Sequence, residues 1–102
     1  MRRRYLALRI ISEYPINKDE ITDAVWNTIL QLFGEYGASQ TNLTFIEHNS
    51  EKNYAVVRCS HKAVEKVKAS IASITEINEK PVAIHVIGVS GTLKALRRRH
   101  PP

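Results

Sequence analysis

The residues best suited to binding chemistry are the arginines near the two ends of the chain. Seven of the 15 Lys and Arg residues lie there, namely Arg2, Arg3, Arg4, Lys94, Arg97, Arg98 and Arg99. A planar guanidinium group can bind phosphate oxygens through two parallel N–H bonds. Each phosphate that is neutralised in this way also releases condensed counterions. The arginine-rich ends therefore favour a phosphate-bearing polyanion as the partner.

The chain between these ends has no excess of positive charge. Residues 5–93 carry eight basic residues against all 10 acidic ones, so the formal net charge of +5 belongs to the ends. We expect a basic N-terminal arm over residues 1–4 and a basic C-terminal tail over residues 95–102. Solvated tails without a ligand are the alternative. A membrane surface is not expected as a partner, because neither end pairs its charges with a long apolar face.

The residues that could serve in catalysis or metal binding lack the necessary spacing. Ser90 follows Gly88 as in a nucleophile elbow, but that motif needs glycine two residues after the serine, and residue 92 is Thr. The four histidines are not spaced as metal ligands. The single cysteine, Cys59, excludes an internal disulfide and is typical of a reduced intracellular protein. We expect no catalytic residue, no metal or other cofactor bound by this chain, and a cytoplasmic location.

The elements that must position these residues follow from the hydrophobic pattern. Alternating apolar residues predict strands over residues 4–12, 41–48, 53–59 and 82–89, and apolar residues three and four apart predict helices over 17–36 and from residue 60. The order of these elements predicts one domain over residues 1–102 of the α+β class, with a ferredoxin-like or RRM-like sandwich. Its four-stranded antiparallel sheet would carry two helices on one face and leave the other open. Residues 90–99 would form a short third helix or a loose tail.

Local signals set the expected ends of the helices. Asn17 followed by Glu20 is typical of a capping box at the start of the first helix. Gly37 is expected to end that helix in a left-handed conformation. Ser60 is expected to cap the second helix, and Ser90 is the candidate cap for the third.

Two surfaces are candidates for binding a protein. On the open sheet face we expect Tyr5, Ala7, Val56 and Ile87 to make a partly apolar surface, and we assign Tyr5, Tyr54 and Val56 to a protein contact there. Stacking of Tyr5 and Tyr54 on nucleic-acid bases is the less favoured use. Arg9 and Arg58 would project from the same face and bind either a phosphate of the polyanion or a carboxylate of a protein. On the first helix, Trp26 and Leu30 lie outside the main apolar stripe that Ile21, Val25, Ile29, Leu32 and Tyr36 form, so they are candidates for a protein contact.

Three segments together resemble a known family. They are Arg3-Arg4-Tyr5-Leu6, the strand Ala55-Val56-Val57-Arg58-Cys59, and Gly88-Val89-Ser90-Gly91-Thr92-Leu93-Lys94. In order and spacing the whole chain resembles the ribonuclease P protein component 2 family, the small ribonuclease P protein of archaea and eukaryotes. The resemblance also indicates that Ser90, Gly91 and Thr92 form a functional turn.

The resemblance implies a role in a ribonucleoprotein enzyme. An RNA subunit with magnesium at its centre would remove the 5′ leader of precursor tRNA, and this chain would stabilise the active RNA without being a catalyst itself. The implied partners are the ribonuclease P RNA, ribonuclease P protein component 3 and other ribonuclease P proteins, with a possible heterotetramer of two copies each. The alternative is a ferredoxin-like protein-interaction module that does not contact RNA. A small-molecule-binding module of similar topology is less favoured, because the sequence has no glycine-rich ligand loop.

Overall fold

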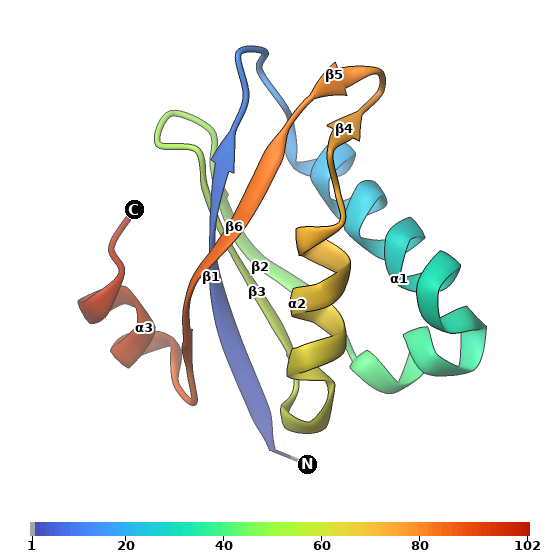
Figure 1. Ribbon diagram of the computed structural model, residues 1–102. Coiled ribbons are helices and arrows are strands. Elements are labelled where there is room, and N and C mark those ends of the chain that lie inside the picture. Colours follow the sequence, from blue (N-terminus) through green and yellow to red (C-terminus); the bar gives the residue numbers. More distant parts are fainter. Residues whose placement is uncertain (1) are drawn as a thin grey trace.

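A computed structural model describes residues 2–102 and shows a sheet with helices on both sides (Figure 1). Met1, the first residue of the expected basic arm, lies outside the described residues. The elements run in the order β1 (Arg3–Ile11), α1 (Lys18–Thr41), β2 (Thr44–Asn49), β3 (Tyr54–Ser60), the 3-10 helix η1 (His61–Ala63), α2 (Val64–Ala72), β4 (Glu76–Ile77), β5 (Lys80–Pro81), β6 (Ala83–Ser90) and α3 (Leu93–Arg99).

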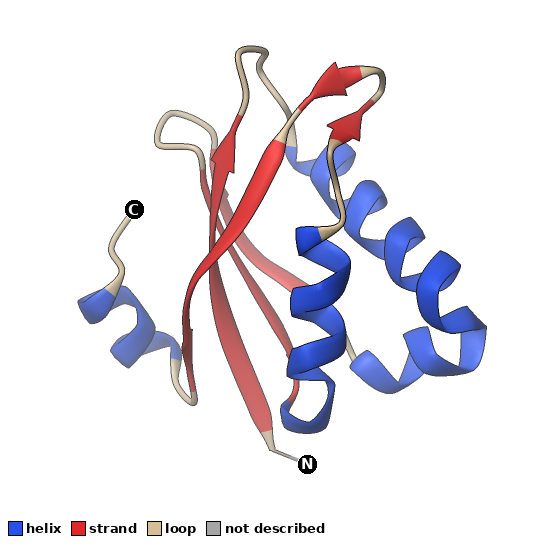
Figure 2. Ribbon diagram, in the orientation of Figure 1, coloured by secondary structure: helices blue, strands red, loops and turns tan. Residues whose placement is uncertain are grey.

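The main sheet has the strand order β2-β3-β1-β6, and all neighbouring strands are antiparallel. Helices α1 and α2 cover one face of this sheet, and α3 packs against the other (Figure 2). Two strand-helix-strand units joined through the β2–β3 hairpin are the split arrangement of a ferredoxin-like fold. The predicted fold class is therefore confirmed.

The alternation along β1 builds two separate cores. Leu6 and Leu8 are fully buried in the larger core beneath α1 and α2, together with Val57 of β3. Ala7 points to the opposite face and is fully buried in a smaller core that includes Leu96 of α3. Successive strand residues face opposite sides of a sheet, so a single strand serves both cores.

The second sheet face is not open, which corrects the expectation from sequence. Leu96 is 0% exposed and packs with Ala7, Tyr54 and Val56. A helix of seven residues is not stable alone, so its docking on the sheet is what orders it. Full burial of a leucine side chain stabilises by about 1.5 to 3 kcal/mol. The sequence shows only two leucines in this segment, which is too weak a pattern to predict that docking.

Helix α1 begins as predicted. The side chain of Asn17 accepts a 2.8 Å hydrogen bond from the backbone N–H of Glu20, and the Glu20 carboxylate accepts one of 3.2 Å from the backbone N–H of Asn17. These reciprocal bonds satisfy two donors that the helix start would otherwise leave unpaired. Ile16 and Ile21, on either side of the cap, both lie in the larger core.

The sequence predicts that helix α1 ends at Tyr36 with Gly37 as its cap, but the structure differs. The left-handed glycine is Gly34, with φ +74°, and it kinks the helix, which then continues to Thr41. Gly37 is buried, and a Cβ there would lie 2.7 Å from the Cβ of Phe33, so this glycine permits close packing across the kink. Asn42, with φ 50°, takes the left-handed position at the true helix end. Strand β2 therefore begins at Thr44 and not at residue 41.

The expected apolar stripe of α1 is buried only in the first part of the helix. Ile21, Val25 and Ile29 are fully buried as predicted, but Leu32 is 51% exposed and Tyr36 is 79% exposed. Past the kink the buried positions are Gly37, Ala38 and Thr41 and no longer those of the uninterrupted stripe.

Helix α2 starts later than predicted, because Ser60 does not cap it. The Ser60 hydroxyl instead donates a 3.1 Å hydrogen bond to the backbone oxygen of Gln40, which joins the end of β3 to the end of α1. The short helix η1 follows, and α2 begins at Val64. Its residues Val67 and Ile71 are buried in the larger core, as the apolar spacing predicts.

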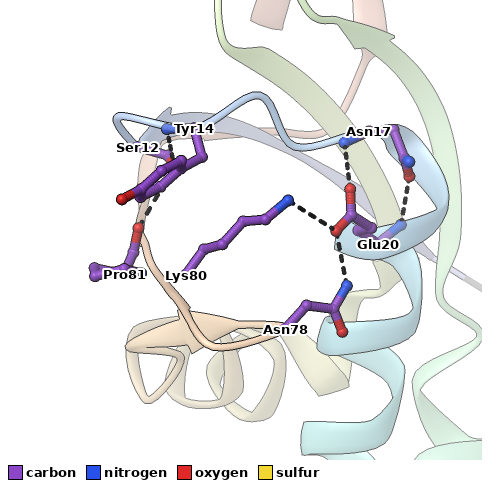
Figure 3. Close-up of polar contacts among 7 residues, drawn as sticks. All are labelled: Ser12, Tyr14, Asn17, Glu20, Asn78, Lys80 and Pro81. Carbon is purple, nitrogen blue, oxygen red and sulfur yellow. Dashed lines mark hydrogen bonds and ion pairs between the residues drawn. The ribbon is translucent and has the colours of Figure 1, made fainter.

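A small hairpin of β4 and β5 precedes β6 and was not predicted. Its turn residues Asn78 and Glu79 have φ angles of 52° and 67°, the left-handed pair typical of a two-residue hairpin turn. Asn78 Nδ2 donates a 2.7 Å hydrogen bond to Glu20 Oε2, and Lys80 Nζ lies 4.0 Å from the same oxygen (Figure 3). The hairpin is thereby joined to the first turn of α1.

Candidate functional site

The arginines at the N-terminal end belong mostly to a strand and not to a free arm. Arg3 and Arg4 are residues of β1 and pair with Ser60 and Cys59 of β3. Arg2 and Arg3 are exposed, whereas Arg4 is half-buried. The Arg4 guanidinium donates a 2.9 Å hydrogen bond to the backbone oxygen of Arg3. The pairing of β1 with β3 therefore fixes the backbone positions from which the Arg3 and Arg4 side chains extend.

The basic residues of α3 fall into two groups. Lys94, Arg98 and Arg99 are exposed. Arg97 forms an ion pair with Glu47 of β2, with Nη2 3.0 Å and Nε 3.1 Å from the same carboxylate oxygen. Arg97 thus ties α3 to the edge strand, and part of its charge is already neutralised. Arg98 and Arg99 are the better candidates for binding phosphate.

The turn Ser90-Gly91-Thr92 connects β6 to α3 and has a structural explanation. Thr92, and not Ser90, caps α3, since its Oγ1 accepts a 3.2 Å hydrogen bond from the backbone N–H of Ala95. Ser90 Oγ accepts a longer bond, 3.4 Å, from the backbone N–H of Thr92. The segment sets the direction in which α3 returns to the sheet. Its expected functional role stays a prediction.

The Arg9 side chain is fixed by contacts with other residues of this chain, at one end of the second sheet face. Its Nη1 donates a 2.8 Å hydrogen bond to the backbone oxygen of Lys52, and its Cζ lies 5.6 Å from the centre of the Tyr54 ring. Arg9 and Tyr54 are also directly opposite in the β1–β3 register. A guanidinium over a tyrosine face is stabilised by the ring quadrupole. These contacts give Arg9 a structural role beside any contact with RNA.

Arg58 and Tyr5 lie at the other end of this face. They are directly opposite each other on β3 and β1, and both are half-buried. Tyr5 packs against the smaller core. Arg58 also stands opposite Thr44 of the edge strand β2. The structure thus separates the two sheet arginines, with Arg58 and Arg9 at opposite ends of the α3-covered face.

The predicted protein-contact residues have different environments. Tyr54 and Val56 are 0% exposed beneath α3, so a partner cannot touch them while α3 is docked, and the expectation of an exposed patch there is wrong. Leu30 is partly buried against the larger core. Trp26 is 38% exposed on the outside of α1 and remains the accessible aromatic residue of the set.

One basic pocket was missed by reasoning from sequence. It has a volume of about 380 Å³ and is lined by residues of three chain segments: Arg2, Gly37, Gln40, Asn42, Ser60, His61, Lys62, Ala63 and Lys66. Lys62 and Lys66 are four residues apart, which would place them on one face of a helix. Nothing local in the sequence connects them to Arg2, about 60 positions away.

The cysteine and the other possible metal ligands show no sign of a reactive or metal-binding site among the described residues. Burial raises the pKa of the Cys59 thiol to about 11, so the thiol stays protonated at neutral pH. No group of three or more His, Cys, Asp or Glu side chains that could hold a metal ion occurs within residues 2–102. In the same residues no helix combines the length and apolar character needed to cross a membrane.

Comparison with known proteins assigns the chain to a family. The model of the Rpp14/Pop5 family matches residues 4–100. Ribonuclease P protein component 2 of Pyrococcus furiosus is 37% identical over 98 residues, covering 96% of this chain and 82% of the relative. The protein of the same name from Methanobrevibacter smithii is 37% identical over 102 residues, covering 93% of this chain and 85% of the relative.

A solved structure shares the fold. A chain in the cryo-EM structure of yeast ribonuclease MRP aligns with a TM-score of 0.74 and 18% identity, over 90% of this chain and 76% of that one. This likeness supports the α+β architecture, while the family rests on the sequence match over residues 4–100. By that match, the chain belongs to the Rpp14/Pop5 family, in agreement with the resemblance that its own motifs indicate.

Proposed function

We propose that this chain is a protein subunit of ribonuclease P, which helps an RNA catalyst to remove the 5′ leader of precursor tRNA. The observation that carries the proposal is the family match over residues 4–100, together with relatives named ribonuclease P protein component 2. In this role the chain acts as part of an endoribonuclease and stabilises the active shape of the RNA. Magnesium belongs to the RNA centre, and the particle works in the cytoplasm.

The charge distribution supports contact with RNA. Exposed basic residues gather where β1 begins and along α3: Arg2, Arg3, Lys94, Arg98 and Arg99. Residues 5–93, in contrast, have more acidic than basic side chains. A polyanion is attracted most strongly to such local excesses of positive charge. RNA is therefore expected to meet the start of β1 and the outer side of α3.

Exposed apolar residues of α1 support contact with other protein subunits. Trp26, Leu32 and Tyr36 are 38%, 51% and 79% exposed, and exposed large apolar side chains often anchor protein interfaces. We assign the exposed surface around Trp26 to ribonuclease P protein component 3, in a complex that can contain two copies of each protein.

The test is reconstitution of precursor-tRNA cleavage. The full chain, component 3 and the RNA subunit are combined, and the magnesium concentration for half-maximal cleavage is measured with and without the chain. The chain is expected to lower this concentration, because protein cations that neutralise phosphates reduce the demand for magnesium. An unchanged magnesium requirement would overturn the proposal.

The exposed apolar residues of α1 also favour a second candidate, a module that binds only proteins. Deleting residues 95–102 cannot separate the two functions, because Leu96 would be lost from the smaller core. Replacing Arg3, Arg98 and Arg99 with glutamine removes charge and leaves that core intact. If affinity for the RNA-containing particle is unchanged by this triple replacement, the protein-only module is the better description.

A further inference from the structure

The basic pocket beside Arg2 is formed by three segments that are joined through hydrogen bonds. The backbone N–H of His61 donates a 2.8 Å bond to the backbone oxygen of Arg2. The Ser60 hydroxyl donates a 3.1 Å bond to the backbone oxygen of Gln40. The start of β1, the end of α1 and the β3–η1 connection are thereby fixed around one hollow of about 380 Å³.

The pocket concentrates positive charge. Arg2, Lys62 and Lys66 line it together with the imidazole of His61, and none of its nine lining residues is Asp or Glu. Lys66 is placed against α1, with its Nζ 5.6 Å from the centre of the Phe33 ring. Three permanent cations around one hollow, without a lining carboxylate, favour an anion inside it.

A second pocket is acidic. The charges of the two pockets show that positive charge is not spread evenly over the molecule. It lies between the first half of α1 and the segment around β4, and its lining includes four carboxylates, those of Asp19, Glu20, Asp23 and Glu76. The basic pocket lies at the other end of α1, where Gly37, Gln40 and Asn42 line it. An approaching polyanion is therefore oriented towards the basic end.

Packing and hydrogen bonds set the shape of the basic pocket before any ligand binds. Gly37, Ser60 and Ala63 are buried lining residues, whereas the basic side chains are exposed. Gly37 contributes only backbone to the wall, because a Cβ would come within 2.7 Å of the Phe33 Cβ. A site that needs little reordering on binding loses less affinity to conformational entropy.

We infer that this pocket binds a phosphodiester group of RNA through Arg2, Lys62 and Lys66. The inference rests on the proposed ribonuclease P function and deepens it, because it adds a contact site on the helix side of the molecule, away from α3. RNA bound both there and at α3 would pass around the end of the sheet where β1 begins.

The test compares two double variants that lose the same charge. Lys62→Gln with Lys66→Gln removes two cations of the pocket. Lys18→Gln with Lys68→Gln removes two lysines that do not line it, and Lys68 lies on the same helix as Lys66. Each full-length variant is reconstituted with the RNA and partner proteins, and its RNA affinity is measured over a range of KCl concentrations. Thermal unfolding of the isolated chains checks that both variants fold.

The pocket variant is expected to flatten the plot of log affinity against log salt by about 1 for each lysine that neutralises a phosphate. The matched control should keep the wild-type slope. Equal slopes for the two variants would overturn the inference, and a reduced slope for Arg98→Ala with Arg99→Ala in the same assay would leave the proposed function standing. If the wild-type chain itself does not bind the RNA, the proposed function and the RNA assignment both fail.

A second measurement separates RNA from a free anion. Pyrophosphate is added to the isolated chain, and the backbone amide signals of residues 37–42 and 60–66 are followed by NMR. Shifts that disappear in the pocket variant, together with its reduced salt slope, support the inference. Shifts with pyrophosphate but no change in the RNA salt slope would mean that the pocket holds a small free anion, which overturns the assignment to RNA.

Discussion

The hydroxyl of Tyr54 donates a 2.6 Å hydrogen bond to the backbone oxygen of His100, which joins a central strand to the end of α3 across 46 positions of sequence. Burial, and next the nearby Glu47 carboxylate, raise the pKa of Tyr54, so the hydroxyl remains a donor at neutral pH. Together with the burial of Leu96 and the ion pair between Arg97 and Glu47, this bond holds α3 on the sheet.

Replacing Tyr54 with phenylalanine should loosen α3 without unfolding the sheet. The change removes one hydrogen bond and keeps the buried ring, so we expect a loss of about 1 kcal/mol in unfolding free energy. Hydrogen exchange at the amides of residues 96–100 should quicken while that of β1 is preserved. Tyr14→Phe, at a tyrosine that is 50% exposed, is the control. Unchanged exchange in α3 would show that the bond does not hold the helix.

Gly88 should be intolerant of a side chain because His100 packs on it. A Cβ at position 88 would overlap the His100 imidazole, with the ring Cγ at 2.8 Å. Gly88→Ala should therefore displace the end of α3 and cost about 1 kcal/mol or more. Adding His100→Ala should restore much of the loss, as a double-mutant cycle would reveal. Gly91→Ala is the matched control, since its nearest neighbour, Arg4 Nη1, is 3.6 Å away. Equal effects of the two alanines would contradict this explanation.

The first turn of α1 should make stability depend on acidity. The backbone hydrogen bond from Asn17, followed by the bond from Asn78, lowers the pKa of Glu20 from its ordinary value of 4.5. The unfolded chain therefore takes up a proton at higher pH than the folded chain, and the carboxylate stabilises the fold above about pH 4.5. This contribution is lost as the pH falls through the lower folded pKa.

Melting temperatures across pH test the contribution of Glu20. Glu20→Gln should melt below the wild type near pH 7, and the gap should close on acidification below pH 4.5. Glu51→Gln, in the turn between β2 and β3, is the control and should track the wild type throughout. A gap that stays constant with pH would show that the charge of Glu20 is not what stabilises the cap.

The three arginines of α3 should differ in their effect on RNA binding. Arg98→Ala with Arg99→Ala should weaken binding and lower the salt slope by up to about 2, since each is exposed and can neutralise one phosphate. Arg97→Ala should change that slope less, because Arg97 already pairs with Glu47. Its cost in stability should be under about 1 kcal/mol, as for other partly exposed ion pairs. A slope identical to wild type in the double variant would exclude direct phosphate contact by α3.

Trp26 should matter to a protein complex and not to the fold. It is 38% exposed on the outside of α1, so Trp26→Asp should leave the melting temperature of the isolated chain nearly unchanged. The same variant should fail to co-elute with component 3 in size-exclusion chromatography. Gln31→Asp, another exposed position of α1, is the control. If the isolated Trp26→Asp chain unfolds instead, the indole belongs to the core.

The sequence alone determined the features that depend on neighbouring residues. The alternation of Leu6, Leu8 and Ile10 and the pairing of Asn17 with Glu20 are local patterns, and the structure confirms both. A strand exposes alternate faces and a helix start needs acceptors whatever the rest of the chain does. The order of strands and helices then left few ways to pack, which is why the ferredoxin-like fold could be predicted.

Only the tertiary structure decided which surfaces remain available. Leu96 covers Val56, Glu47 neutralises part of the charge of Arg97, and Lys62 joins Arg2 around one pocket. Each of these pairs is separated by 40 or more positions, so no local pattern records it. Their positions depend on how the kinked α1 and the docked α3 pack on the sheet. That packing is determined by many weak contacts between residues distant in sequence.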